Sequence, residues 1–535
     1  MKKITFLTSI ILALAVLVCG CSITDKSKTA VQTEVQNSQE EADVIRLGCV
    51  PPDTLNPLIT VHASVSDFLS LVYEGLFQTE PDQTATPVLA SEIIASDDNT
   101  VYTVKLKEGI RFHNGKAFTS ADVTATLDYI FMYGGKYAYI KDKILLYAAE
   151  SDYSVKITLN SSVSDFANLL DFPILPSGLI DTDFAAQNSS FVPVGTGMYK
   201  YDSSSERKNI YLKANDKRHS SLPTPNIEVV DVEILADEET IISAFDAGSI
   251  DILTTSWKDG AEMNLTTPLY NTYYTLGNKY TFVGINTNCA AFDTEEERHL
   301  LSERIDAKAL CDDIMLGHGS VAYSPVREDV YYNETVAQDD KSGGTEDDKS
   351  DKDMTVKPDE AENDTAKKEA PDAEENKIII LYNSDSKTKE RAALAIRHQL
   401  ESYGYSCELS GSPFATYLEK VANCHYDLYI GEVNPDNSIN LEFMFGTNRS
   451  MQNICTYYDT ELDTLVSNIS RMSGKENKTV AWENFEKYYK QKVFQIPLYF
   501  TKKEVFVNKK IEGKLKPNIS FAFSGFEELD VKEDK

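Results

Sequence analysis

Positive charge is scarce in this chain, and the short motifs of common enzymes are missing. Its 535 residues include 52 lysines and arginines against 84 aspartates and glutamates, a formal net charge of −32. A nucleic-acid partner needs a basic protein surface, so this composition argues against one. There is no G-x-S-x-G or H-E-x-x-H sequence, and no nucleophile-base pair can be read from residue spacing. We therefore predict that the protein is not an enzyme, and an exported hydrolase is not expected.

Histidine and cysteine are few, and their spacing matches no metal site. The seven histidines include no pair at i,i+3 or i,i+4, and the eight cysteines include no C-x-x-C. We expect no cofactor and no directly coordinated metal. Of the six cysteines after Cys21, most could be buried free thiols. An exported chain also permits disulfides, and a Cys407–Cys424 pairing is geometrically possible.

Long hydrophobic runs are missing after residue 21, and the run before it has the layout of an export signal. Lys2 and Lys3 precede an apolar stretch over residues 10–18, and Gly20 supplies a small residue before Cys21. The stretch is shorter than the roughly 20 residues of a membrane-spanning helix. The end of this signal (1–20) resembles a bacterial lipobox, which predicts a lipid anchor on Cys21 at the outer face of the cell membrane. Ordinary cleavage that releases a soluble protein is the alternative.

Two segments lack the apolar residues that a folded core requires. Residues 21–42 are polar and are predicted to form a flexible tether about 25 Å long on average. A second break in composition covers residues 334–376, and residues 338–376 hold 15 acidic and 6 basic side chains. This acidic insert is predicted to be disordered, because it cannot bury enough apolar area to offset its chain entropy. A charged surface helix is the alternative, although Pro358 and Pro371 would interrupt it.

Periodic patterns elsewhere predict an α/β protein. Capping boxes at Ser64–Asp67 and Thr119–Asp122 are expected to begin helices, the first of them closing near Gly75. Alternating strands and helices after the insert predict parallel βαβ units, whose ligand crevice would lie at the carboxyl ends of the strands. The expected strands are 44–50, 101–107, 155–160, 378–382, 406–410 and 426–431, and the helices of the βαβ units are 387–403 and 414–422.

A series of short motifs runs along nearly the whole chain. The most diagnostic stretch is NTVYTVKLKEGIRFHNG (99–115) followed by FTSADV (118–123). The others are LNPL (55–58), LVYEGLF (71–77), PVLA (87–90), PVGTGMY (193–199), FVGIN (282–286), RID (304–306) and QIPLY (495–499). Each motif alone is weak, but their order resembles that of the dipeptide/oligopeptide-binding proteins of ABC importers, family 5 of the extracellular solute-binding proteins.

This resemblance implies a two-lobed clamshell of the periplasmic-binding-protein type (type II, large class), with an additional α/β domain and the acidic insert. Lobe I would comprise residues 43–88, 195–277 and 493–535, the additional domain residues 89–194, and lobe II residues 278–492. Hinge crossings would lie near residues 277 and 493. The insert would then belong to lobe II, where a long loop is tolerated because the cost of loop closure grows slowly with length.

The same resemblance implies a function. The protein would be a monomeric receptor that captures a peptide by closure of its lobes and delivers it to the permease subunits of an ABC importer. Nickel chelates, haem and oligosaccharides are alternative cargoes of this class. A signalling lipoprotein that passes a bound peptide to a sensor is a further alternative, and the sequence does not separate it from an import receptor.

Residues that would face the ligand follow from the same comparison of motifs. Val61, His62 and Ala63 match a cleft-facing loop of the family, although His62 could be an ordinary exposed loop histidine. Tyr280 and Tyr499 lie near the hinge crossings, where they could line the cleft or pack the hinge. We therefore expect the first ligand-binding segment in the loop and possible further contacts at the hinge.

A second ligand-binding segment is expected at the exit of the last βαβ strand. In peptide-binding members of the family, this segment carries a tryptophan and then an aspartate that pairs with the peptide amine. This chain departs from the pattern, because Gly431 is followed by Glu432. A buried ammonium without a counter-charge is costly, so Glu432 or Asp436 would supply the carboxylate for a peptide, although Asp436 could be only a turn residue. The candidates in this segment are Glu432, Val433, Asn434 and Asp436.

Overall fold

The computed structural model describes most of the chain after residue 42, and the described residues belong to one compact unit. The predicted signal, the tether, Cys21, Asp436 and the acidic insert lie outside the described residues. The described residues are 43–179, 191–205, 208–256, 265–266, 269–327, 330, 377–434, 437, 441–446, 457–472 and 474–532.

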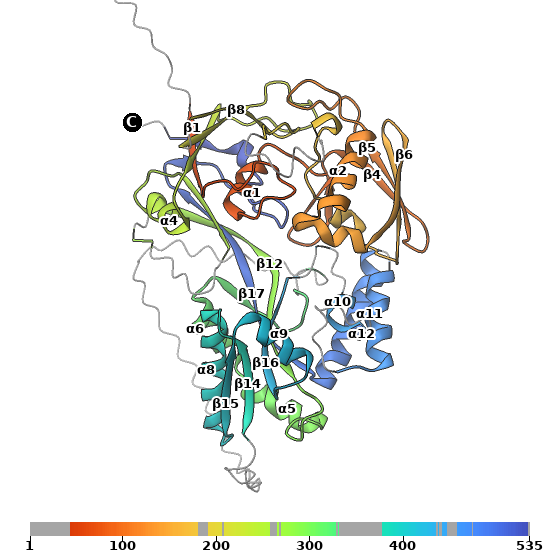
Figure 1. Ribbon diagram of the computed structural model, residues 1–535, viewed down its shortest axis with the longest axis vertical. Helices are drawn as coiled ribbons and strands as arrows, with labels where there is room; N and C mark the ends of the chain where they lie inside the picture. The colour runs from red at the N-terminus through yellow and green to blue at the C-terminus, as the bar shows by residue number, and fades with distance from the viewer. Residues whose placement is uncertain are drawn as a thin grey trace, which may run out of the picture. The chain divides into compact units, whose positions relative to one another are not determined.

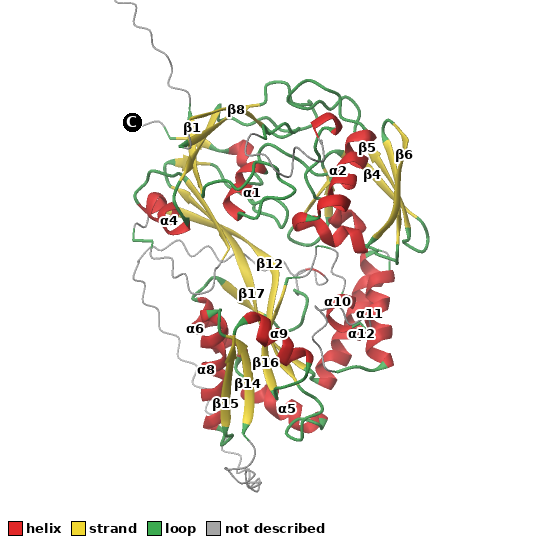
Figure 2. Cartoon of the chain, viewed as in Figure 1, coloured by secondary structure: helices red, strands yellow, loops and turns green. Residues whose placement is uncertain are grey.

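A mixed 11-stranded sheet runs through this unit (Figures 1 and 2). Its strands follow the order β15-β14-β16-β12-β17-β11-β1-β10-β9-β8, with β13 paired to β17. The strands are β1 (Val44–Cys49), β8 (Tyr199–Ser205), β9 (Asn209–Ala214), β10 (Val229–Ile234), β11 (Ile252–Ser256), β12 (Tyr270–Ile285), β13 (Gly319–Val321), β14 (Ile378–Asn383), β15 (Cys407–Ser412), β16 (Leu428–Val433) and β17 (Gln495–Asn508).

Two long antiparallel strands, β12 and β17, connect the two halves of this sheet (Figure 1). The first half of β12 pairs with the second half of β17, which also pairs with β11. The second half of β12 pairs with the first half of β17 and with β16. The register shifts between Leu276 and Tyr280, so residues 277–279 form an irregular step between the two halves. We refer to this step and the facing Thr501 as the strand crossing.

The predicted βαβ units are confirmed. Strand β14 pairs in parallel with β15 and with β16. Helices α8 (Lys387–Ser402) and α9 (Phe414–Ala422) connect these strands in sequence. Helix α8 turns Ala392, Ala393, Ile396 and Leu400 inward, as their spacing predicts.

A separate four-stranded antiparallel sheet has the order β4-β5-β7-β6. Helix α2 (Ser120–Tyr133) contacts this sheet and buries Val123, Leu127 and Ile130. Its predicted capping box is present, and Asp122 Oδ2 accepts a hydrogen bond from the backbone nitrogen of Thr119 at 2.8 Å. The strands are β4 (Ala90–Ala95), β5 (Val101–Leu106), β6 (Ile144–Ser151) and β7 (Ser154–Leu159).

The capping box predicted at Ser64 is wrong. Helix α1 covers Ala63–Leu69, so it begins one residue earlier than Ser64 and ends before Gly75. The Ser64 hydroxyl instead accepts a hydrogen bond from the backbone nitrogen of Val50 at 3.2 Å. A tertiary contact with the end of β1 therefore uses the side chain that the local pattern assigned to a cap.

The remaining elements are short or lie outside the sheets, and their helices include the pair α11–α12. Among the described residues, no helix combines the length and hydrophobicity needed to span a membrane. The elements are α4 (Glu238–Asp246), α5 (Glu295–Arg304), α6 (Ala307–Met315), α10 (Glu442–Phe445), α11 (Thr460–Arg471), α12 (Lys475–Lys492), η1 (Gly135–Asp142), η2 (Phe166–Leu169), η3 (Ser177–Leu179), η4 (Phe526–Glu528), β2 (Phe77–Thr79), β3 (Ala85–Pro87), β18 (Ile511–Glu512) and β19 (Asp530–Val531).

Buried apolar side chains form separate clusters on the two sides of the strand crossing. One cluster joins β1, β10 and α1 with the four-stranded sheet. Two others surround β14 and β16 and include side chains of α5 and α6, before β13, and of the helices after it. The predicted boundaries of lobe I, the additional domain and lobe II stay predictions, and we use these names below for the predicted ranges.

Candidate functional site

The main cavity lies beside the strand crossing and has a volume of about 1340 Å³. Residues of all three predicted regions line it: the end of α1 in lobe I, the chain after η2 in the additional domain, and the exit of β16 in lobe II. The crossing itself contributes Gly277, Asn278 and Thr501. Pockets for drug-sized ligands usually measure roughly 300–1,000 Å³, so this cavity has room for a larger molecule.

Basic and acidic side chains are nearly balanced around the main cavity, in contrast to the net charge of −32 for the whole chain. A cavity with both signs of charge suits a ligand that itself carries both. The basic residues at its wall are Lys107, Lys136, Lys143, Arg218, Lys279, Lys502 and Lys503, and the acidic ones are Asp67, Glu74, Asp142, Asp171, Glu442 and Glu527.

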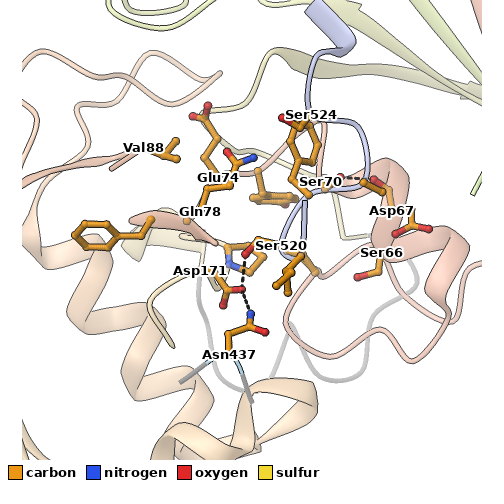
Figure 3. A pocket seen from close by; sticks show the side chains of 18 of the residues that line it. Ser66, Asp67, Ser70, Glu74, Gln78, Val88, Asp171, Asn437, Ser520 and Ser524 are labelled. Carbon is orange, nitrogen blue, oxygen red and sulfur yellow. Dashed lines mark hydrogen bonds between the residues drawn. The ribbon is translucent and has the colours of Figure 1, made fainter. Parts of the chain in front are cut away.

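Asp171 connects three distant segments at the wall of the main cavity (Figure 3). Its Oδ2 accepts hydrogen bonds from Ser520 Oγ at 2.8 Å and from Asn437 Nδ2 at 2.9 Å. Asn437 in turn accepts one from Asn278 Nδ2 at 3.2 Å. Burial raises the pKa of Asp171, even though Ser520, Lys136 and Asn437 act in the opposite direction.

Gly75, in the motif LVYEGLF, allows the backbone of Asp171 to come close to the backbone of this motif. A Cβ atom on Gly75 would lie 2.6 Å from the carbonyl oxygen of Asp171, far inside van der Waals contact. The backbone nitrogen of Leu76 also donates to the carbonyl oxygen of Leu170 at 3.0 Å. This motif therefore sets the position of the carboxylate in the cavity.

A second charged group surrounds Lys136. Its Nζ donates to Ser66 Oγ at 2.5 Å and lies 5.0 Å from the centre of the Tyr137 ring. Burial lowers the pKa of Lys136, while Asp67 raises it and Lys503 lowers it further. Asp67 accepts a hydrogen bond from Thr254 Oγ1 at 2.6 Å, and its Oδ1 lies 4.0 Å from Lys503 Nζ.

Glu432 is already neutralised by two lysines. Lys279 Nζ lies 3.1 Å from Glu432 Oε1, and Lys389 forms an ion pair with Oε2. Burial alone would raise the pKa of Glu432, but the two lysines outweigh it and hold this pKa below its usual value. A ligand ammonium would have to displace a lysine to bind here, so this placement weakens the prediction that Glu432 supplies the amine-binding carboxylate.

The other candidates at the exit of β16 are placed differently from one another. Asn434 lines the main cavity, while the side chain of Val433 is buried in the core. Asn437, which sequence reasoning did not select, also lines the cavity. Asp436 lies outside the described residues. The cavity therefore meets the carboxyl end of β16, as expected for a parallel βαβ unit.

Val61, His62 and Ala63 line a second cavity of about 610 Å³. It shares Ser66, Asp67, Lys136 and Lys503 with the wall of the main cavity, so the two lie next to each other. The Val61 side chain is 82% exposed. Ligand contact by these three residues stays a prediction.

Tyr280 and Tyr499 are buried and line neither cavity. The Tyr280 hydroxyl lies 3.2 Å from Gln495 Oε1, to which it donates, and its ring packs on Phe282 and Phe500. Tyr499 packs in the cluster around β14 and α8. The structure therefore places both tyrosines in the packing role that the sequence left open as the alternative.

No described cysteine lines either cavity. The described cysteines, including Cys407 and Cys424, are free thiols, so the disulfide considered for that pair is absent. Within the described ranges, no group of three or more His, Cys, Asp or Glu side chains could hold a metal ion.

Asp171, Asn437 and Ser520 are bonded residues of the cavity wall that sequence reasoning did not select. They lie 266 and 349 positions apart from their partners in the sequence, so no local pattern joins them. The signal that could have drawn attention to Asp171 is Gly75, since a glycine inside an apolar motif often marks a close backbone approach.

The family model and the similar proteins that match this chain all point to one family. The model of the bacterial extracellular solute-binding proteins, family 5 Middle, matches residues 84–453. The oligopeptide-binding protein AppA of Bacillus subtilis is 24% identical over 340 residues, 61% of this chain and 61% of that protein, so the match leaves more than a third of it uncovered. The probable D,D-dipeptide-binding periplasmic protein DdpA of Escherichia coli is 23% identical over 509 residues, 90% of this chain and 93% of that protein.

The fold also matches solved structures. The structure of HbpA2 from Haemophilus parasuis superposes with a TM-score of 0.72 over 92% of this chain and 100% of that one, at 18% identity. This likeness confirms the predicted fold, an α/β clamshell of the periplasmic-binding-protein type.

Proposed function

The chain belongs to the bacterial extracellular solute-binding proteins of family 5, and from this we propose that it captures a peptide for an ABC importer. In this proposal, a di- or oligopeptide enters the main cavity, the lobes close around it, and the closed form delivers it to permease subunits in the membrane. No step needs covalent chemistry, and the receptor works as a monomer.

The observation that carries this proposal is the balance of charge in a large cavity beside the strand crossing. A peptide carries an ammonium, a carboxylate and a row of backbone donors and acceptors. The cavity wall offers carboxylates, lysines and amides such as Asn434 and Asn437. Buried charges are tolerated only when paired, so a wall with both signs favours a zwitterion over a ligand of one sign.

The proposed closure uses the strand crossing as a hinge. Among the described residues, the large sheet crosses this point through two strands, β12 and β17, and their register is interrupted there. Hinges are a few residues that absorb the change in backbone angles, and Gly277 has the freedom this requires. The relatives named above as oligopeptide- and D,D-dipeptide-binding proteins support a peptide as the cargo.

A ligand screen on residues 43–535 tests the cargo. Di- to octapeptides, amino acids, sugars, haem and nickel-histidine would each be added and the melting temperature recorded. Peptide at 100 times its dissociation constant stabilises the folded form by about 2.7 kcal/mol, which corresponds to a rise of about 3 °C for a chain of this size. If a sugar or a chelate raises the melting temperature while peptides of every length leave it unchanged, the peptide assignment is wrong.

Import is tested by measuring whether living cells take up a labelled peptide that bound in the ligand screen. Deleting the gene should abolish uptake, and restoring it should recover the original rate. If the peptide binds the purified protein but uptake does not change on deletion, the signalling alternative replaces the import receptor.

The anchor is proposed at Cys21, which lies outside the described residues. Its support is the lipobox-like end of the signal, in which Gly20 precedes Cys21 while Val18 precedes Cys19. Labelling cells with a fatty-acid analogue should mark the wild-type protein and the control variant Cys19→Ala. Cys21→Ala should remain unlabelled, and continued labelling of this variant would rule out the anchor.

A further inference from the structure

One oxygen of Asp171 has no hydrogen-bond partner. Oδ2 accepts the bonds from Ser520 and Asn437, whereas Oδ1 is buried and accepts none. The carboxylate stands at the wall of the main cavity, and its two bonded neighbours are drawn in Figure 3. A buried carboxylate oxygen without a donor is costly, so it calls for a partner of positive charge or a strong donor.

No cation of the protein fills this role among the residues that the structure describes. Asp171 takes part in no ion pair there, and Lys136, the lysine that most affects its pKa, contacts Ser66 and the Tyr137 ring instead. The other carboxylate near the crossing, Glu432, has two lysine partners. Asp171 is therefore a buried carboxylate of the cavity wall that a cationic ligand could neutralise without breaking an ion pair within the protein.

We propose that Asp171 binds a primary ammonium group of the ligand through Oδ1. This inference rests on the proposed function and deepens it, because it names the residue of the additional domain that selects ligands with a free amine. The ammonium donates to Oδ1 and neutralises the carboxylate as the cavity closes. An amino terminus and a lysine side chain both supply this group.

The same contact couples the ligand to lobe closure. Oδ2 of Asp171 already receives bonds from Ser520 at the end of lobe I and from Asn437 in lobe II. An ammonium on Oδ1 therefore joins a network that holds lobe I, lobe II and the additional domain at one carboxyl group. Binding favours the arrangement in which all these contacts are made together.

Asp171→Asn is the informative substitution because it keeps the shape and both existing bonds. One carbonyl oxygen has two lone pairs, so the asparagine oxygen can still accept from Ser520 and Asn437. The amide nitrogen then occupies the position of Oδ1 and repels an ammonium. Asp128→Asn is the matched control: it makes the same change of charge in the additional domain, on an exposed side chain that accepts from the Tyr147 hydroxyl.

The experiment measures dissociation constants by calorimetry for four alanine-based pentapeptides: one with a free amino terminus, one with a propionyl group in place of the first residue, and versions of both with an internal lysine. The propionyl group removes the amine without adding bulk. Wild type and Asp128→Asn should bind the free-amine peptide alike. Asp171→Asn should bind it at least about thirtyfold more weakly, the loss expected for breaking a buried charge pair.

The outcomes distinguish the proposed role of Asp171 from the proposed peptide-binding function. If wild type binds the propionyl peptide without lysine as tightly as the free-amine peptide, or if Asp171→Asn binds both as wild type does, the role of Asp171 is overturned while peptide binding stands. If the propionyl peptide with an internal lysine binds wild type as tightly as the free-amine peptide does, the lysine side chain is the source of the ammonium. If wild type binds none of the four peptides while the cargo screen finds another solute, the peptide function and the role of Asp171 are overturned together.

Discussion

Lys478 of α12 forms an ion pair with Asp165, which directly precedes η2, and so joins lobe II to the additional domain. Both side chains are mostly buried, at 14% and 22% exposure. Two backbone-directed bonds lie beside this pair: the Ser164 nitrogen donates to the Ser470 carbonyl at 3.0 Å, and Asn99 Nδ2 donates to the Arg471 carbonyl at 3.0 Å. These contacts lie between the helix pair α11–α12 and the loops of the four-stranded sheet.

Breaking this ion pair should lower stability by more than a surface pair would. We expect a coupling energy of about 0.5–3 kcal/mol between Lys478→Met and Asp165→Asn in a double-mutant cycle, measured by urea unfolding. The control pair Lys308–Asp312, whose side chains are 71% and 60% exposed, should give only about 0.3–0.5 kcal/mol. Equal coupling energies for the two pairs would show that the contact between α12 and the additional domain is not formed in solution.

Glu432→Gln should destabilise the protein, because it leaves Lys279 and the buried Lys389 without their shared counter-charge. We expect a loss of about 2–4 kcal/mol in the free energy of unfolding, somewhat less than for a fully buried pair. Lys387→Met, which breaks an exposed pair with Glu390 on the same helix as Lys389, should cost under about 1 kcal/mol.

The pH dependence of stability gives an independent check on Glu432. Its pKa is lower in the folded protein than in the unfolded chain, so its stabilising contribution is complete above the usual value of 4.5 and is lost as the pH falls further. Melting curves between pH 3 and pH 7 should therefore show a difference between wild type and Glu432→Gln that shrinks below about pH 4.5. A difference in melting temperature that stays constant over this pH range would contradict the lowered pKa of Glu432.

Asp171→Asn should make the unliganded protein more stable at neutral pH. Burial raises the pKa of Asp171 from the usual 3.8, so the ionised carboxylate is a cost that grows as the pH rises through the folded-state pKa and vanishes below 3.8. The melting temperature of the variant should exceed that of wild type at pH 7, and the two should converge below about pH 4. A variant that melts below wild type at pH 7 would show that Lys136 and the neighbouring hydroxyl already compensate the charge.

Gly75→Ala should disturb both stability and ligand binding, because its new Cβ meets the backbone of Asp171. We expect a loss of about 1–3 kcal/mol from overpacking, with weaker binding of any ligand that contacts Asp171. Gly248→Ala is the control, since a Cβ there meets nothing within 4 Å and only its left-handed backbone, with φ of 78°, is strained. Gly248→Ala should lower the melting temperature slightly and leave the dissociation constant unchanged. If Gly75→Ala binds the ligand as tightly as wild type does, the motif at Gly75 does not determine the position of Asp171 in the cavity.

Local signals predicted the fold well where neighbours in sequence are also neighbours in space. The strands and helices of the βαβ units and the capping box at Thr119 are confirmed for this reason. The box at Ser64 failed because its hydroxyl bonds to Val50, a contact that no short window contains.

The site was predicted less well than the fold. The exit of β16 reaches the main cavity through Asn434, and the loop at His62 reaches the adjacent one. Tyr280 and Tyr499 were selected for their place near the hinge, yet the packing of their rings against lobe II keeps them in the core. Proximity in the chain indicates the region of a site, whereas the direction of a side chain depends on what packs around it.

The sequence by itself determined the alternation of strands and helices, the family through its ordered motifs, and the acidic excess that argues against a nucleic-acid partner. Only the tertiary structure decided which carboxylates already have a counter-charge within the protein. Glu432 and Asp171 are both acidic residues near the strand crossing, but Lys279 and Lys389 neutralise the first, while the second keeps one oxygen without a partner. The physical reason is that the availability of a charge depends on neighbours that folding brings from hundreds of residues away.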